Sequence, residues 1–202
     1  MTGTIRYLRA RRVPGAVAAL GMISFAAFLV ARVMVGAGEF AEQALIPVVV
    51  VGPAAAAVAA LITLDEPSLE IALAAPFRLG VARALQMTIL MLGAVVVFAP
   101  LGQFEGMRLG FPAAARNVVG YTGLGLVVGP WAGATWAWIA PTVYVVSALT
   151  IEGAARTGTL LFWSTRPDWD TASWAVAALL MAAGLVACLI DRPGRVGDGE
   201  EA

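Results

Sequence analysis

The sequence predicts an all-α membrane protein with six transmembrane helices, and three observations lead to that fold class. Of the 202 residues, 60% are hydrophobic and only 13% are charged, whereas soluble domains carry about 25% charged residues. The mean hydropathy is +0.86. Six apolar runs approach the ~20 residues that a helix needs to cross a bilayer.

These apolar runs define the expected elements in chain order. Because a spanning helix requires about 17–25 mostly apolar residues, each run is expected to form one helix. Four prolines (Pro100, Pro112, Pro130 and Pro141) divide the region of the third to fifth helices. The expected helices cover residues 13–35, 44–64, 84–101, 113–128, 133–149 and 172–190.

The arginines indicate the orientation, since cytoplasmic loops of membrane proteins are enriched in basic residues. Basic residues precede the first run, separate the second from the third, and follow the sixth, and an even number of spans places all three positions on one side. Between them, residues 36–43 carry only acidic charges, as an outer loop would. We therefore expect a multi-pass protein of the cytoplasmic (inner) membrane, with residues 1–12 and the tail 191–202 both cytoplasmic. The arginines concerned are Arg6, Arg9, Arg11, Arg12, Arg78, Arg83, Arg192 and Arg195.

Missing residue types exclude several kinds of chemistry. The chain has no histidine and a single cysteine, Cys188, so it can build neither a Cys/His metal site nor a disulfide framework. All 13 basic residues are arginines, and a phosphate-binding P-loop requires a lysine. We expect no catalytic residue and no metal in this chain, and any ATP would be bound by another chain. A net charge of zero favours no nucleic-acid partner.

Residues 65–78, between the second and third runs, read as a short amphipathic helix at the cytoplasmic surface. Asp65 or Glu66 can cap its start, Pro67 suits its first turn, and Pro76 is expected to end it. Leu69 and Leu73 lie at helical spacing on one face. The alternative is an interfacial loop without a partner.

Two short motifs and the layout of the chain resemble permease subunits of type-2 ABC exporters. The run from Ser68 to Pro76 (SLEIALAAP), followed by Arg78, resembles the coupling-helix segment between the second and third spans of that family. The run from Arg116 to Leu126 (RNVVGYTGLGL) is similar to the start of the fourth span in many permeases of high-GC bacteria. Six spans, two cytoplasmic termini and a longer outer segment, 152–170, complete the likeness.

The resemblance implies a single permease domain over residues 1–202. Two such subunits, identical or not, would pair in the bilayer, and each would dock a separate ABC ATPase subunit that binds ATP and Mg. A lesser contact would come from the turn 130–135, and residues 157–163 of the outer segment would form short re-entrant helices. The ATPase-docking residues would be Glu66, Pro67, Ser68, Leu69, Glu70, Leu73, Pro76, Phe77 and Arg78.

Three further residues are candidates for a transport path or an intramembrane polar pair: Arg32, Arg116 and Tyr144. A membrane arginine costs a few kcal/mol, so it usually pairs with an acid or reaches an interface. Glu39 and Glu42 are the expected partners of Arg32. The alternative is that both arginines are structural or extend to the headgroups.

Tryptophans and acids near the ends of the runs have simpler interpretations. Because indoles favour the headgroup level, Trp131, Trp136 and Trp138 are expected at the inner interface, and Trp163, Trp169 and Trp174 at the outer one. Asp168 and Asp170 are expected to form an exposed acidic turn, without a metal.

The function expected from this sequence is export of an amphipathic or hydrophobic cargo, such as a peptide, an antibiotic or a lipid-like molecule. Two other classes remain open. A non-transporting membrane scaffold or assembly protein would need no ATPase and no docking helix. A small secondary transporter should carry an ionisable residue deep within a span.

Overall fold

The computed structural model describes residues 12–35, 41–64, 76–103, 109–151 and 160–190, and within these ranges the chain is all-helical. Four short 3₁₀ helices, η2 (Ile62–Leu64), η3 (Ala99–Gln103), η4 (Ala134–Trp136) and η5 (Leu160–Thr165), lie at the ends of the α-helices or between them. The α-helices are α2 (Val13–Val35), α3 (Ala41–Leu61), α5 (Pro76–Val97), α6 (Phe111–Ala132), α7 (Ile139–Thr150) and α9 (Thr171–Ile190).

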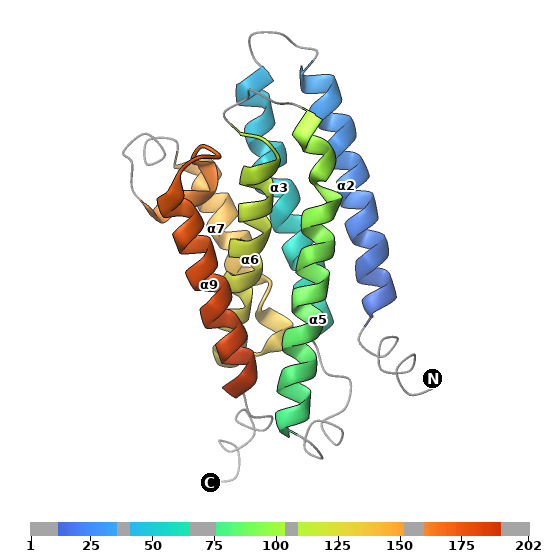
Figure 1. The fold of residues 1–202 in the computed structure, drawn as a ribbon, viewed down its shortest axis with the longest axis vertical. Helices are drawn as coiled ribbons and strands as arrows, with labels where there is room; N and C mark the ends of the chain where they lie inside the picture. Colours follow the sequence, from blue (N-terminus) through green and yellow to red (C-terminus); the bar gives the residue numbers. More distant parts are fainter. Residues whose placement is uncertain (1–11, 36–40, 65–75, 104–108, 152–159, 191–202) are drawn as a thin grey trace.

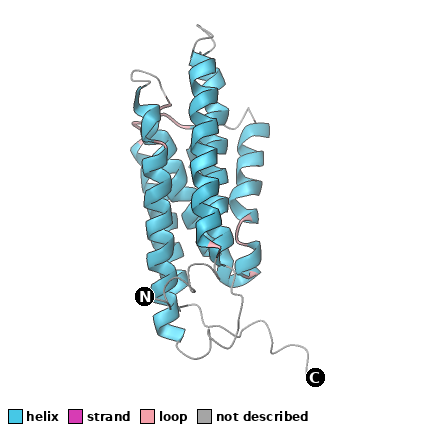
Figure 2. Ribbon diagram, turned by 90° about the vertical axis from the view of Figure 1, so that its right-hand side faces the viewer, coloured by secondary structure: helices cyan, strands magenta, loops and turns pink. Residues whose placement is uncertain are grey.

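The six α-helices form a bundle along the long axis of the molecule, as Figures 1 and 2 show. Helix α6 is central: it packs against α3, α5, α7 and α9, while α2 lies on α3 and α5. The first residue of α2 and the last residue of α9 lie at the same, lower end of the bundle in Figure 1. Helix α3 ends and helix α5 begins at that end too.

Each predicted apolar run overlaps one of the six described helices, but the starts of the third and the fifth were wrong by six residues or more. Helix α5 begins at Pro76 rather than at residue 84, so Arg78 and Arg83 lie inside it instead of between helices. Pro76 is the first residue of this helix, where proline is tolerated because the N–H groups of a first turn have no acceptor within the helix. Helix α7 has only 12 residues and begins at Ile139, after η4.

The outer surface of the bundle is apolar, the reverse of a soluble protein. Helix α5 exposes a stripe of Leu85, Ile89, Leu92 and Val96, and α2 and α9 expose similar side chains. Such continuous apolar surface is unfavourable in water and suited to lipid. Three helices, with windows at Val13–Val30, Gly80–Leu101 and Thr171–Ile190, are long and apolar enough to cross a membrane.

The other three helices differ in length or in polarity. Val48–Leu64 and Ile139–Thr150 are shorter apolar helices. Helix α6 has 22 residues, but Arg116, Asn117 and several glycines lower its hydropathy. These residues are buried against other helices, so α6 does not need an apolar surface all round. The fold is compatible with a membrane protein and contains three helices of full spanning character.

Helices α6 and α9 approach most closely where each carries a glycine. A Cβ on Gly123 would lie 2.4 Å from the backbone nitrogen of Met181, and one on Gly184 would lie 2.8 Å from the carbonyl oxygen of Gly123. Small residues let helix backbones approach in this way. Gly125 of α6 lies against Leu61, the last residue of α3, where a Cβ would be 2.2 Å from the leucine side chain.

Replacing Gly123 by alanine should destabilise the bundle by about 1–3 kcal/mol, the usual cost of forcing extra atoms into a packed core. Backbone atoms of α9 cannot move aside without separating the two helices. Gly93→Ala is the matched control, because a Cβ there meets nothing within 4 Å and alanine favours a helix. Thermal unfolding in detergent measures both; equal melting temperatures would contradict the close contact.

Candidate functional site

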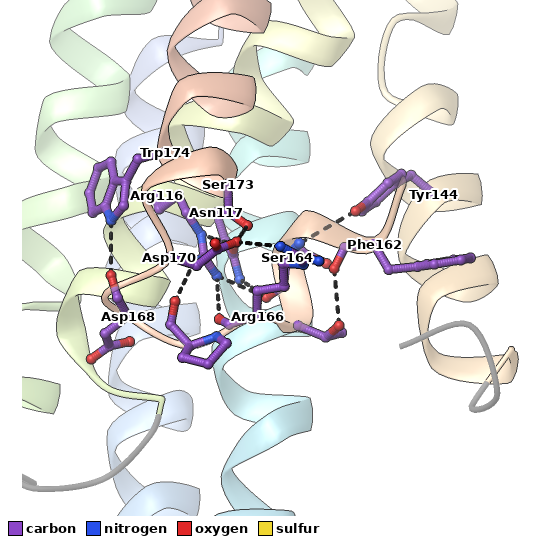
Figure 3. Close-up of polar contacts among 12 residues, drawn as sticks. Arg116, Asn117, Tyr144, Phe162, Ser164, Arg166, Asp168, Asp170, Ser173 and Trp174 are labelled. Atoms are coloured by element: carbon purple, nitrogen blue, oxygen red, sulfur yellow. Dashed lines mark hydrogen bonds and ion pairs between the residues drawn. The ribbon is translucent and has the colours of Figure 1, made fainter. Parts of the chain in front are cut away.

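The first turns of α6 meet the segment that precedes α9 in a set of buried hydrogen bonds (Figure 3). We refer to Arg116, Asn117, Ser164 and Asp168 as the polar cluster. Arg116, Asn117 and Ser164 are fully buried. Since a buried polar group costs free energy unless it is hydrogen-bonded, the partners of each side chain decide what this site can do.

Arg116 holds the end of η5 and the loop after it. Its guanidinium donates to the carbonyl oxygens of Arg166 and Pro167 at 2.9 Å each, and to that of Ser164 at 3.3 Å. The planar guanidinium presents five N–H donors in a fixed fork, which suits several acceptors at once. The side chain is therefore occupied by backbone acceptors, with the carboxylates of Asp168 and Asp170 acting on it electrostatically.

Asn117 joins α6 to α3 at a carbonyl that a proline leaves without its helical donor. In an α-helix the carbonyl of Val49 would accept from the N–H of residue 53, but Pro53 has none. The side-chain nitrogen of Asn117 donates to this carbonyl oxygen at 2.9 Å, and to that of Ser164 at 2.9 Å. One amide thus ties α3, α6 and η5 together.

Asp168 caps helix α6 from 58 residues away along the chain. Its carboxylate accepts hydrogen bonds from the N–H groups of Gly110, at 3.1 Å, and Ala113, at 3.0 Å. Gly110, the residue before α6, offers no side-chain cap of its own. A negative charge at this position also complements the positive end of the helix.

Asp170 caps its own helix, α9. It accepts from the hydroxyl of Ser173 and from Arg166 at 3.0 Å. The Ser173 hydroxyl, and then the Arg166 guanidinium, hold the pKa of Asp170 below its ordinary value. The expectation of an exposed acidic turn was therefore wrong: both aspartates are partly buried and each caps a helix.

Three aromatic rings pack beside the polar cluster. Tyr121, Tyr144 and Trp163, the aromatic cluster, have ring centroids 5.3–5.8 Å apart. Trp163 is buried against Gly120, where a Cβ would lie 2.2 Å from its ring. The prediction that Trp163 belongs to an outer interface belt was wrong, because Gly120 opens space for the indole inside the bundle.

Hydroxyl groups gather where the aromatic cluster meets the polar cluster. The Tyr144 hydroxyl accepts from the backbone N–H of Ser164 at 3.4 Å. The hydroxyls of Tyr121 and Ser164 lie next to each other. Neither makes a hydrogen bond of good geometry with the residues that the structure describes.

The structure brings two of the three candidate path residues together. Arg116 and Tyr144 both contact Ser164. Arg32 is exposed on α2, with its guanidinium 5.8 Å from the centre of the Phe28 ring. Of its expected partners, Glu39 lies outside the described residues and the side chain of Glu42 is not described.

The predicted docking helix falls largely on residues 65–75, which lie outside the described ranges; these hold Glu66, Pro67, Ser68, Leu69, Glu70 and Leu73. Pro76, Phe77 and Arg78 form the first residues of α5, and their side chains are not described. Of the segment expected to re-enter, the described part contains η5, which packs against α3, α6, α7 and α9.

The geometry of the polar cluster favours a structural role over a catalytic or metal-binding one. Across the described ranges, no three His, Cys, Asp or Glu side chains come close enough to hold a metal ion. The buried guanidinium and amide and the partly buried carboxylate of Asp168 have backbone partners. The sequence could have indicated the Asp170 cap, because an aspartate before a helix is a common start signal. Nothing local indicated that Asp168 caps α6.

The fold and the site define a class, an all-helical protein with an apolar surface and a buried polar cluster at one end. No protein-family model matches the sequence, and no curated protein or solved structure matches it significantly. The structure therefore shows this class of protein, and its function is a proposal.

Replacing Arg116 by methionine should lower stability by about 2 kcal/mol or more. The carbonyl groups of Arg166 and Pro167 lose their donor, at a cost of about 1 kcal/mol or more each, whereas that of Ser164 keeps Asn117. Arg32→Met removes an exposed arginine and should change stability by less than about 0.5 kcal/mol. Thermal unfolding in detergent, followed by tryptophan fluorescence, compares the two. Equal effects would contradict the structural role assigned to Arg116.

Stability should also fall at acid pH because of Asp170. Its pKa in the folded state is depressed, so its contribution is complete above the unfolded value of about 3.9. That contribution is lost as the pH falls through the lower, folded value. The Asp170→Asn variant should lack this part of the acid destabilisation. Between about pH 5 and 8, the free energies of unfolding of the variant and the wild type should change equally with pH. Unfolding measured as a function of pH tests this, and identical acid limbs would refute it.

Proposed function

We propose that this chain is a permease subunit of an ATP-driven ABC exporter of the cytoplasmic membrane. It would work in a dimer with a second permease subunit, each subunit docked to a separate ATPase that binds ATP and Mg. The cargo would be amphipathic or hydrophobic. In this arrangement both termini are cytoplasmic and the six helices all cross the bilayer.

One observation carries the proposal. Helix α3 ends and helix α5 begins at the end of the bundle where α2 begins and α9 ends, and most of the docking-helix motif lies between these two helices in the sequence. The arginine-rich segments of the sequence adjoin that same end. Under the positive-inside rule this end faces the cytoplasm, where an ATPase would bind.

A scaffold is the second candidate, and the polar cluster favours it. Arg116 and Asn117 are bonded to backbone carbonyls in the way a static structural element requires. A secondary transporter has less support, because the buried guanidinium of Arg116 is committed to backbone acceptors and offers no titrating group. Binding of an ATPase separates the first candidate from both others.

Purification of the tagged chain from its own host in mild detergent should recover an ATPase in a stoichiometric amount. Combining Glu70→Arg with Leu73→Asp should abolish that recovery, because the change reverses a charge and removes an apolar contact. Glu105→Arg is the control, since the elements that flank it in the sequence, the end of α5 and the start of α6, lie at the opposite end of the bundle. Recovery of the chain alone after crosslinking, or an ATPase retained by the double variant, would refute the proposal.

A further inference from the structure

An apolar groove of about 450 Å³ lies between α6 and α7. Helix α6 lines it with Leu124, Val128 and Ala132. The residues that line the other side run from Trp136 of η4 to Tyr144 of α7. This volume falls in the range of ligand-binding cavities, about 300–1,000 Å³.

The length of the groove corresponds to one leaflet of a bilayer. From Leu124 to Ala132 the helix rises about 12 Å, at ~1.5 Å per residue. The hydrocarbon core of a membrane is about 30 Å thick, so one leaflet contributes about 15 Å. The groove forms because α7 is short. This helix begins only at Ile139, and the residues before it form η4 instead of a further helical turn beside α6.

The lining selects hydrocarbon over peptide. None of the described residues that line the groove is charged. At its Tyr144 end, the tyrosine oxygen accepts the N–H of Ser164. A peptide strand there would leave its N–H and C=O groups without partners, at several kcal/mol each in an apolar setting.

The groove is much shorter than a spanning helix. It follows about 12 Å of α6, whereas a helix of a second subunit would follow the whole hydrocarbon core of about 30 Å. A narrow, flexible chain fits this length.

Two exposed tryptophans lie at the end of the groove next to η4. Trp131, next to Ala132, is 86% exposed, and Trp136 is 54% exposed. Indoles favour the headgroup level of a bilayer. We infer that the groove binds one acyl chain of a membrane lipid, whose headgroup lies at these two tryptophans, in the leaflet where α2 begins. This inference requires the bundle to lie in a bilayer and is independent of transport or an ATPase.

Photolabelling of the full chain in lipid nanodiscs tests the inference. The probe is phosphatidylglycerol with a diazirine in the middle of one acyl chain, and labelled peptides are mapped by mass spectrometry. In the wild type, peptides from residues 124–144 should carry more label than the exposed stripe of α5. Val143→Trp should reduce this label about tenfold, as expected for a loss of about 1.4 kcal/mol of binding free energy.

Val146→Trp is the matched control, on the same helix. Val143 lines the groove and is 57% exposed, whereas Val146 is 55% exposed and is not part of the lining. The control should keep the wild-type label. Equal labelling of the groove and of α5, or equal effects of the two variants, would mean ordinary surrounding lipid and would overturn the inference. Disulfide-linked dimers formed by Val143→Cys would overturn it too, because a second subunit would then cover the groove.

Discussion

The structure depends on one constraint: every buried backbone group must find a partner where water is scarce. Three side chains meet it at one end of the bundle. Asn117 replaces the donor that Pro53 removes from α3, Asp168 accepts from the first N–H groups of α6, and Arg116 donates to the carbonyls that follow η5. These bonds join α3, α6, η5 and the start of α9, segments far apart in the sequence, into one unit.

Packing around α6 follows from this arrangement. The close crossing of α6 and α9 at Gly123 and Gly184 keeps Asp168 next to the start of α6, and Trp163 fills the space beside Gly120. If the chain acts as a permease, α3, α6 and the start of α9 would have to move together, because these bonds join them into one rigid unit.

The sequence was sufficient to locate all six helices, because helix-length apolar runs leave few alternatives. The sequence was less reliable where one residue is compatible with two different local structures. Pro76 can end a helix or begin one, and Arg83 reads as a loop residue although it is buried within α5. Within the candidate site, Arg116 and Tyr144 were recognised as unusual, but their partners were not. The Asp168 cap and the contact between Asn117 and Val49 span 55–68 residues of sequence, so no local pattern reveals them.

Backbone hydrogen exchange of the wild-type chain in nanodiscs tests the central claim most directly. The N–H groups of Gly110 and Ala113 start a helix and would normally exchange rapidly, because the first helical amides have no partner within the helix. Held by Asp168, they should exchange as slowly as amides in the middle of α6. Exchange as fast as that of an uncapped first turn would contradict the account, because α6 would then not be joined to the segment before α9.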